Sequence, residues 1–297
     1  MTPEQWRQGG KTLEVPDGRV FWTEHGSEHG DAPALPVLVL HGFPTSSWDF
    51  CEVAQIVARR RRVVLFDFIG FGHSDKPHDA GYSLFEQADV VELVARAAGL
   101  RRAHVWAHDM GTSVATEVLA RRERELLHFE PASIVLMNGS VHIEMARPTV
   151  GQKILLSPAG DLFARLGSRA VFFAQMKRIY GRPARDADLQ GMWELLDRAD
   201  GRRRLPAIIA YMRERVRFRR RWVGALERLD LPALVAWGEK DPVARLEIAR
   251  QLEQEIAGSE RARFAELGHY PQVEDAAQVA SAVEAFWSKH DAAAPRA

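Results

Sequence analysis

The most constraining feature of this sequence is a series of short, fully apolar runs separated by longer segments with helical periodicity. A run of four apolar residues is typical of a strand that is buried on both faces of a parallel sheet. The intervening segments predict helices that cover those faces, and therefore an α/β fold with a mostly parallel sheet. The predicted strands are residues 37–40, 63–66, 104–107, 134–137 and 234–237, and the clearest helices are 85–100, 112–122 and 278–290.

The alternation of strands and helices stops between residues 137 and 234. This stretch is rich in Arg, Leu, Phe and Ala, with Gly and Pro breaks, and contains no convincing strand, which predicts an inserted helical subdomain. Insertions of this kind arise at the carboxyl edge of a parallel sheet, where ligands also bind, so we expect a lid over an active site. The predicted division is residues 1–140 and 230–290 for the core, 141–229 for the helical cap, and 291–297 for a disordered tail.

Composition and charge limit the classes of function. The 297 residues include 40 basic and 40 acidic ones, so there is no overall attraction to nucleic acid. The single cysteine, Cys51, excludes an intramolecular disulfide. No apolar signal sequence and no run of about 18 apolar residues is present, so we expect a cytoplasmic protein without a transmembrane segment. The oligomeric state is left open.

A short motif, A-H-D-M-G at residues 107–111, follows a predicted strand and opens a predicted helix. It is a variant of the G-x-S-x-G nucleophile elbow in which Asp109 replaces the serine. The elbow is a sharp turn that needs small neighbours, and Asp tolerates positive φ better than most residues. An Asp that merely caps a helix would look the same in isolation, so the surrounding motifs decide between the two interpretations.

Two further motifs supply the partners of such a nucleophile. W-G-E-K-D-P contains Asp241, and L-G-H-Y-P contains His269. The chain order Asp109, Asp241, His269 is the nucleophile, acid, histidine order of α/β-hydrolases. Each motif alone would be an ordinary turn, but together at successive strand ends they predict a catalytic site. We expect Asp241 to be the acid rather than Asn138, because a neutral amide cannot stabilise an imidazolium as a carboxylate does.

The motif H-G-F-P at residues 41–44 follows the first apolar strand. In this fold, an oxyanion hole uses one backbone N–H from that loop and one from the residue after the nucleophile. The predicted donors are therefore the backbone N–H groups of Phe43 and Met110. We expect neither a metal nor an organic cofactor.

Other motifs carry weaker signals. G-F-G at residues 70–72 lacks the third glycine and the acidic residue of a dinucleotide site. His25 and His29 are interpreted as solvated residues of a polar loop. The Arg-rich run 213–222 is interpreted as a solvated, salt-bridged lid helix. The alternative is a patch for anionic lipids or for a carboxylate-bearing substrate.

Several stretches of the chain resemble those of a known enzyme group, the Asp-nucleophile branch of the α/β-hydrolase superfamily. This branch includes epoxide hydrolases and haloalkane dehalogenases, and the closest resemblance is to the mesoderm-specific transcript proteins of animals. The likeness covers almost the whole chain, but the membrane segments of the animal proteins are absent. The stretches are H-G-F-P-T-S-S (41–47), G-F-G (70–72), S-D-K-P (74–77), F-E-Q-A (85–88), H-D (108–109), F-R-R-R-W-V-G-A-L (218–226) and H-Y-P-Q (269–272).

The resemblance implies a two-step reaction. Asp109 would attack a saturated carbon and form an alkyl ester, and His269, supported by Asp241, would activate water to hydrolyse it. An epoxide leaves as an alkoxide and needs a proton donor, a role that lid tyrosines perform in epoxide hydrolases. Tyr211 lies in the corresponding place, and Tyr180 is the only other tyrosine of the lid.

A halide leaving group needs N–H donors instead. Dehalogenases of this branch place a tryptophan after the nucleophile and an asparagine in the oxyanion loop, where this chain has Met110 and Phe43. The arginine that fluoroacetate dehalogenases carry after the nucleophile is also absent. Hydrolysis of a small hydrophobic epoxide is therefore favoured, with His108 and Trp193 as further candidates for substrate contact. The alternatives are haloalkane dehalogenation, to which Trp193 or Trp222 could supply a donor, β-lactone opening, or a catalytically silent partner protein.

Overall fold

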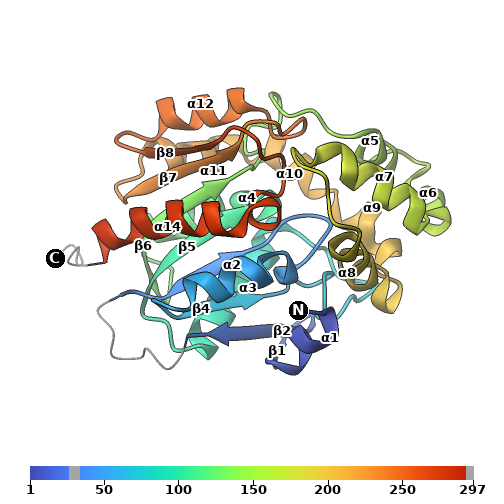
Figure 1. Ribbon diagram of the computed structural model, residues 1–297, viewed down its shortest axis with the longest axis horizontal. Coiled ribbons are helices and arrows are strands. Elements are labelled where there is room, and N and C mark those ends of the chain that lie inside the picture. The colour runs from blue at the N-terminus through green and yellow to red at the C-terminus, as the bar shows by residue number, and fades with distance from the viewer. Residues whose placement is uncertain (27–33, 292–297) are drawn as a thin grey trace.

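The computed structural model describes residues 1–26 and 34–291, and the strands in these ranges form one eight-stranded sheet (Figure 1). β1 pairs with β2, and β2 with β4, in antiparallel fashion, and every other pair is parallel, which confirms the predicted mostly parallel sheet. In sheet order the strands are β1 (Gly10–Val15), β2 (Gly18–His25), β4 (Val63–Phe66), β3 (Val37–Leu40), β5 (Arg102–His108), β6 (Glu130–Met137), β7 (Ala233–Gly238) and β8 (Glu260–Phe264).

The five predicted apolar strands are β3 to β7, and alternate residues of each face opposite layers. Val37 and Val39 join one hydrophobic core, and Leu38 and Leu40 join the other, as the twofold period of a strand requires. The first core contains α2 (Cys51–Val57) and α14 (Ala276–His290). The second contains α3 (Leu84–Ala97), α4 (Met110–Arg122), α11 (Arg219–Glu227) and α12 (Leu246–Glu255). The shorter elements are α1 (Pro3–Gln8), η2 (Ser47–Phe50) and α13 (Pro271–Glu274).

The chain between β6 and β7 is helical, and no strand occurs among its described residues. We call residues 141–229 the helical insertion; Figure 1 shows its helices up to residue 208 grouped at one end of the molecule, whereas α11 lies beside the core. Its last helix returns to the core, where Arg221 and the Trp222 indole N–H bind the buried Glu117 of α4. The other elements are α5 (Val150–Leu155), α6 (Gly160–Leu166), α7 (Arg169–Ile179), α8 (Asp186–Asp197), η3 (Arg198–Arg204), α9 (Leu205–Ile208) and α10 (Tyr211–Arg217).

Two expectations from the sequence, for His25 and for Asp291, need correction, and others concern residues that the structure does not describe. His25 is the last residue of β2 rather than part of a loop, and its ring stacks on Trp6 with centroids 5.0 Å apart. Asp291, the first residue of the expected disordered tail, instead binds the buried Arg61 at 2.7 Å. His29 and residues 292–297 lie outside the described residues. Across residues 1–26 and 34–291, every helix is too short or too polar to cross a membrane.

Candidate active site

Asp109 occupies the tight turn between β5 and α4. Its φ of 47° and ψ of −112° lie in a region that residues other than glycine rarely adopt, as expected for a strained elbow. The neighbouring backbone is very close, because a Cβ on Gly111 would lie 2.3 Å from the carbonyl oxygen of Leu40. Only glycine fits there, and this approach brings the loop after β3 beside Asp109.

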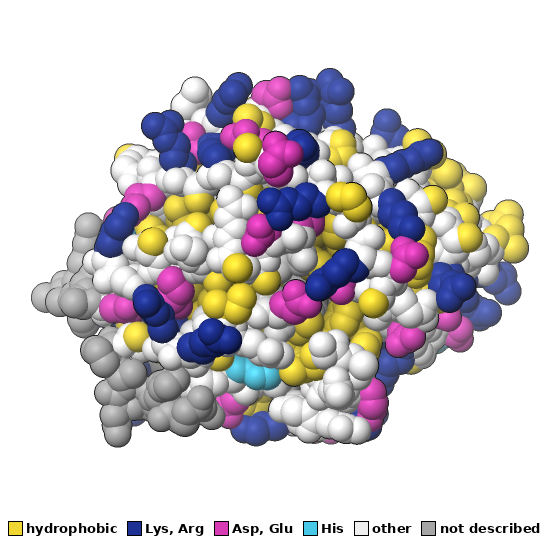
Figure 2. All heavy atoms as spheres, viewed as in Figure 1, with side chains coloured by type: hydrophobic (Ala, Val, Ile, Leu, Met, Phe, Trp, Pro, Cys, Tyr) yellow, Lys and Arg dark blue, Asp and Glu magenta, His cyan; other side chains and the backbone are white. Residues whose placement is uncertain are grey.

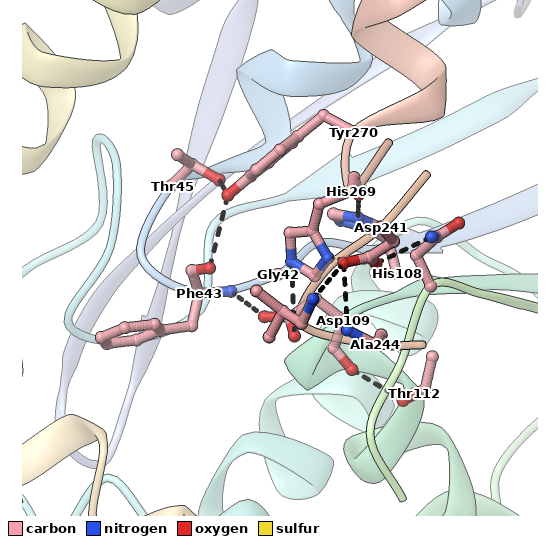
Figure 3. Close-up of polar contacts among 12 residues, drawn as sticks. Gly42, Phe43, Thr45, His108, Asp109, Thr112, Asp241, Ala244, His269 and Tyr270 are labelled. Carbon is pink, nitrogen blue, oxygen red and sulfur yellow. Dashed lines mark hydrogen bonds and ion pairs between the residues drawn. The ribbon is translucent and has the colours of Figure 1, made fainter. Parts of the chain in front are cut away.

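The loop after β3 binds the Asp109 carboxylate directly. The backbone N–H of Phe43 donates a hydrogen bond to Asp109 Oδ2 at 2.9 Å (Figure 3). Met110 is the first residue of α4, where a backbone N–H has no partner within the helix. The two N–H groups predicted for an oxyanion hole therefore come from the loop that contacts Asp109 and from the residue that follows it.

His269 lies between the two predicted carboxylates. Its Nδ1 is 2.7 Å from Asp241 Oδ2, and its Nε2 is 3.8 Å from Asp109 Oδ1 (Figure 3). Because an ionised carboxylate only accepts hydrogen bonds, Nδ1 carries a hydrogen and Nε2 faces Asp109. All three side chains are buried. The structure thus brings together the three residues that the motif order predicted.

The side chain of Asp241 accepts three hydrogen bonds besides its contact with His269. Its Oδ1 accepts the backbone N–H groups of Val243 and Ala244 at 2.7 and 3.0 Å, and its Oδ2 accepts Asn138 Nδ2 at 2.8 Å. Asn138 directly follows β6 with a φ of 44°, and its side-chain oxygen accepts the backbone N–H of Gly238 at 2.9 Å. Sequence reasoning treated Asn138 only as a rival position for the acid and missed this positioning role, although a polar residue directly after a buried strand was a usable signal.

The charges around His269 favour its protonated form. Burial lowers the pKa of His269, but the hydrogen-bonded Asp241 and the nearby Asp109 outweigh that effect and raise the pKa to about 9. His269 is therefore an imidazolium near neutral pH. This state suits a carboxylate nucleophile, which needs no base to become reactive.

His108 lies beneath the site rather than in contact with a substrate. Its ring is fully buried, Nε2 donates to the carbonyl oxygen of His269 at 2.7 Å, and Nδ1 accepts Gln272 Nε2 at 3.3 Å. Burial, reinforced by the charge of His269, lowers the pKa of His108 to about 3, so the ring is neutral. Its contacts support the backbone of His269, which corrects the expectation that it binds substrate.

A cleft of about 820 Å³, including its open mouth, lies between the strand ends and the helical insertion. Phe43 and His269 line it from the core, and Trp193 lines it from α8. Tyr180 is not part of this lining: its ring stacks on Tyr270 with centroids 5.5 Å apart, and its hydroxyl points to Met192 Sδ at 3.7 Å. The second lid tyrosine expected from sequence therefore lies away from the cleft.

Tyr211 is buried beside the oxyanion loop, with its ring centroid 6.0 Å from that of Phe43. It packs behind the ring of Phe43 and is not among the residues that line the cleft. Burial and then the charge of Asp109 raise the pKa of Tyr211, and the charge of Arg215 opposes them. The phenol is therefore a neutral hydrogen-bond donor close enough to Asp109 to sense its charge.

Arg215 is a further residue of this region that sequence reasoning did not single out. It belongs to the Arg-rich run, which is divided between α10 and α11 and does not form the single lid helix expected from sequence. Within the run, Arg219 pairs with Glu144 and Arg221 with the buried Glu117. Arg215 differs, because it is buried, lies 4.6 Å over the ring of Tyr211, and donates from Nε to Ser113 Oγ at 2.7 Å. Its Nη2 has no hydrogen-bond partner among the described residues. Helical periodicity alone could not reveal which arginine of the run points inward.

Comparison with known proteins places this arrangement in a family. The alpha/beta hydrolase fold family matches residues 36–276, and the chain belongs to that family. It is 42% identical over 272 residues to LipZ of Mycobacterium tuberculosis, a protein named as a hydrolase, with 91% of this chain and 92% of LipZ covered. It is 35% identical over 284 residues to the human mesoderm-specific transcript homolog protein, with 91% of this chain and 83% of that protein covered. These matches confirm the resemblance seen in the sequence.

Solved structures share the same fold at lower identity. Haloalkane dehalogenase DbeA from Bradyrhizobium elkani superimposes with a TM-score of 0.80 at 20% identity, covering 96% of this chain and 99% of that one. The enol-lactonase from Burkholderia xenovorans gives a TM-score of 0.75 at 19% identity, covering 94% of this chain and all of that one. At such identities the likeness establishes the α/β-hydrolase fold, and the chemistry has to be argued from the site.

Proposed function

We propose that this α/β hydrolase uses Asp109 as a nucleophile to open small hydrophobic epoxides through a covalent ester. One observation carries the proposal. A carboxylate, rather than a hydroxyl, occupies the elbow, with one oxygen bound to the N–H of Phe43 and the other facing His269. A carboxylate in this position is suited to attack at saturated carbon. The apolar residues that dominate the lining of the cleft favour a hydrophobic substrate.

In the first step, Asp109 attacks an epoxide carbon, and the carbon–oxygen bond of the ring breaks. The resulting alkoxide is strongly basic, so a donor must meet the oxygen as its charge develops. Tyr211 is the candidate donor, because its ring lies against that of Phe43, whose backbone N–H binds Asp109. Tyr211 does not line the cleft in this structure, so this role requires the insertion to shift when substrate binds. The guanidinium of Arg215 over the ring would stabilise negative charge on the phenol as it gives up its proton.

Between the two steps, the imidazolium of His269 releases its proton and the phenolate of Tyr211 takes one up, by exchange through solvent. In the second step, the neutral ring of His269 removes a proton from water, and the hydroxide so formed attacks the ester carbonyl of Asp109. Esterification removes the negative charge that helps to hold the pKa of His269 near 9, so the imidazole loses its proton more readily after the first step. The N–H groups of Phe43 and Met110 would bind the tetrahedral oxyanion. Collapse of this intermediate releases a diol and regenerates the carboxylate of Asp109.

Haloalkane dehalogenation is the second candidate, and it rests on Trp193. This residue lines the cleft, and we propose its indole N–H as the donor to a halide leaving group. The same two-step use of Asp109 and His269 would apply. The two candidates differ only in the leaving group and in the donor that meets it.

A single-turnover experiment in ¹⁸O-water tests the nucleophile independently of the leaving group. Peptide mass spectrometry should find label in the carboxylate of Asp109, because the water oxygen attacks the ester carbonyl. Label found only in the product would refute the covalent mechanism. A parallel panel of epoxides, bromoalkanes, lactones and esters then decides the substrate class, and halide release without epoxide turnover would replace epoxide hydrolysis by dehalogenation.

A further inference from the structure

The formal charge of this chain is zero, but it is unevenly divided between the core and the helical insertion. Residues 141–229 contain 19 Lys and Arg against 9 Asp and Glu, which leaves 21 basic and 31 acidic residues elsewhere. Within residues 145–185 the imbalance is stronger, with eight basic residues and Asp161 as the one acidic residue. A positive end on a neutral molecule orients it toward anionic surfaces.

Large exposed hydrophobic side chains concentrate on the same part of the chain. Of the seven among the described residues, five belong to the insertion: Val150, Leu162, Leu166, Val171 and Val216. Leu162 and Leu166 are 60% and 73% exposed and, four residues apart on α6, lie on one face of that helix. Figure 2 shows hydrophobic side chains gathered at the end of the molecule where Figure 1 places α6. Contiguous exposed apolar surface of this kind marks an interaction site.

The cations beside this apolar surface lack carboxylate partners. Lys153, Arg165 and Arg169 are exposed, and none forms an ion pair with another described residue. Arg169 instead donates to Gln190 at 3.0 Å and lies over the ring of Phe173 at 5.7 Å. Elsewhere in the insertion, arginines such as Arg219 are neutralised by acidic neighbours. The positive charge next to α6 is therefore available to a partner.

The same helices form the mouth of the cleft. Gln152 of α5, Phe163 of α6 and Val171 of α7 line it, together with Gly167 and Ser168 between α6 and α7. Whatever covers this surface would thus lie directly against the opening of the candidate active site.

We propose that this surface docks on membranes that contain anionic lipids, so that amphiphilic substrates pass from the bilayer into the cleft. We call it the α5–α7 face and define it by Val150, Leu162, Leu166 and Val171 with Lys153, Arg165 and Arg169. Apolar side chains flanked by free cations are the composition that interfacial membrane-binding segments need, because the chains enter the headgroup boundary and the cations meet anionic lipid. Since no described helix can span a bilayer, the contact is peripheral.

Vesicle cosedimentation tests the α5–α7 face without any activity assay. The full chain is mixed with vesicles of phosphatidylcholine alone or of phosphatidylcholine with phosphatidylglycerol. We expect binding to the anionic vesicles that weakens as salt is raised. The Leu162→Ser, Leu166→Ser double variant should lose at least about tenfold in binding, because two apolar side chains no longer leave water. Arg165→Gln, Arg169→Gln should cost about fivefold for each charge removed.

The chain offers a matched control for the leucine variant. Leu126 is also an exposed leucine, at 59%, but it lies outside the insertion, shortly after α4. The Leu126→Ser variant should bind vesicles like the wild type, and circular dichroism should find all variants folded, since each substituted side chain is exposed. Absence of binding to phosphatidylglycerol vesicles, or equal losses in the Leu126→Ser control, would overturn the proposal. A dimer in sedimentation velocity that the double variant dissolves, without vesicle binding, would assign the face to self-association instead.

Discussion

Two parts of the candidate site hold their polar groups by different means. One is the set of residues at the strand ends, Asp109, Asp241 and His269, which we call the floor of the site; the other is the helical insertion that covers it. On the floor, both oxygens of Asp241 accept hydrogen bonds, two of them from backbone N–H groups. In the insertion, Tyr211 is held by ring contacts, and Arg215 Nη2 has no hydrogen-bond partner among the described residues. The backbone donors, Val243 and Ala244, are held in place by the chain itself in the short loop after β7, whereas stacked side chains can change rotamer. We therefore expect the floor to keep the reacting groups in fixed positions, and the side chains of the insertion to adjust to the substrate.

Substitution of the proposed nucleophile, Asp109, should have the largest effect on turnover and tests the role of the floor. Asp109→Asn keeps the shape of the elbow but replaces the carboxylate by an amide that cannot attack carbon. Turnover of the best epoxide should fall about a millionfold, the scale found when a nucleophile is removed. Asp109→Ala serves as the control, because an introduced Asn could deamidate and restore activity. Activity of Asp109→Ala within about a hundredfold of wild type would remove Asp109 from the chemistry.

The acid comes next in expected effect. Asp241→Asn should slow hydrolysis of the ester about 10⁴-fold, because an amide cannot stabilise the imidazolium of His269 as a carboxylate does. Asn138→Ala should cost only about tenfold, since the backbone N–H groups of Val243 and Ala244 still hold Asp241. Rapid-quench mass spectrometry should find the ester accumulating in Asp241→Asn. Equal losses in the two variants would mean that positioning, not charge, is the role of Asp241.

Tyr211 is the strongest test on the insertion side. Tyr211→Phe should slow ester formation from epoxides by about two to four orders of magnitude, the range for losing a general acid, and leave ester hydrolysis nearly unchanged. The matched control is Tyr180→Phe, whose hydroxyl lies against Met192 away from the cleft. Rapid-quench kinetics would separate the two steps. A similar slowing in both variants would show that Tyr211 acts through the packing of the insertion.

The two regions also differ in how far the sequence could predict them. Strands β3 to β7 follow from apolar runs, and parallel strands end at one edge, so Asp109 and Asp241 had to meet once their strands were recognised. His269 follows β8, and its place was predicted from its motif and the chain order alone. Strands β1 and β8 were missed because they lie at the edges of the sheet with polar residues facing water, and β2 was missed because polar residues interrupt its apolar run.

Side-chain directions in the insertion depend on helix register and on packing between short helices, which no local pattern encodes. Tyr180 follows the last residue of α7 and turns toward Tyr270, whereas Tyr211 begins α10 and packs on Phe43. Both are lid tyrosines in the sequence, and only the packing separates them. Likewise, Arg215 is indistinguishable from its arginine neighbours until α10 is placed against α4.

Arg215 carries a smaller expected effect. Arg215→Leu should slow ester formation about tenfold, because the phenol of Tyr211 loses the cation that stabilises its developing negative charge. It should not slow the reaction further in the Tyr211→Phe background, since the two residues act on the same charge. Arg219→Gln, which removes an exposed ion pair with Glu144, is the control and should leave both steps unchanged. Additive losses in the double variant would contradict the coupling.

The smallest effect, and the one that examines the floor most directly, is a change in the titration of His269. Asp241 lies 2.7 Å from Nδ1 and Asp109 lies 3.8 Å from Nε2, and both charges raise the pKa of the ring to about 9 against the effect of burial. Because an opposite charge stabilises the protonated form, removing either carboxylate must lower this pKa. Histidine NMR should therefore find His269 titrating below about 9 in Asp109→Asn, and lower still in Asp241→Asn, whose carboxylate is the closer one. The drop in Asp109→Asn mimics the loss of charge on esterification, which is what converts His269 into a base for the second step. An unchanged pKa of His269 in Asp109→Asn would mean that the charge of Asp109 does not control the protonation of His269. Esterification would then not explain how His269 loses its proton before the second step.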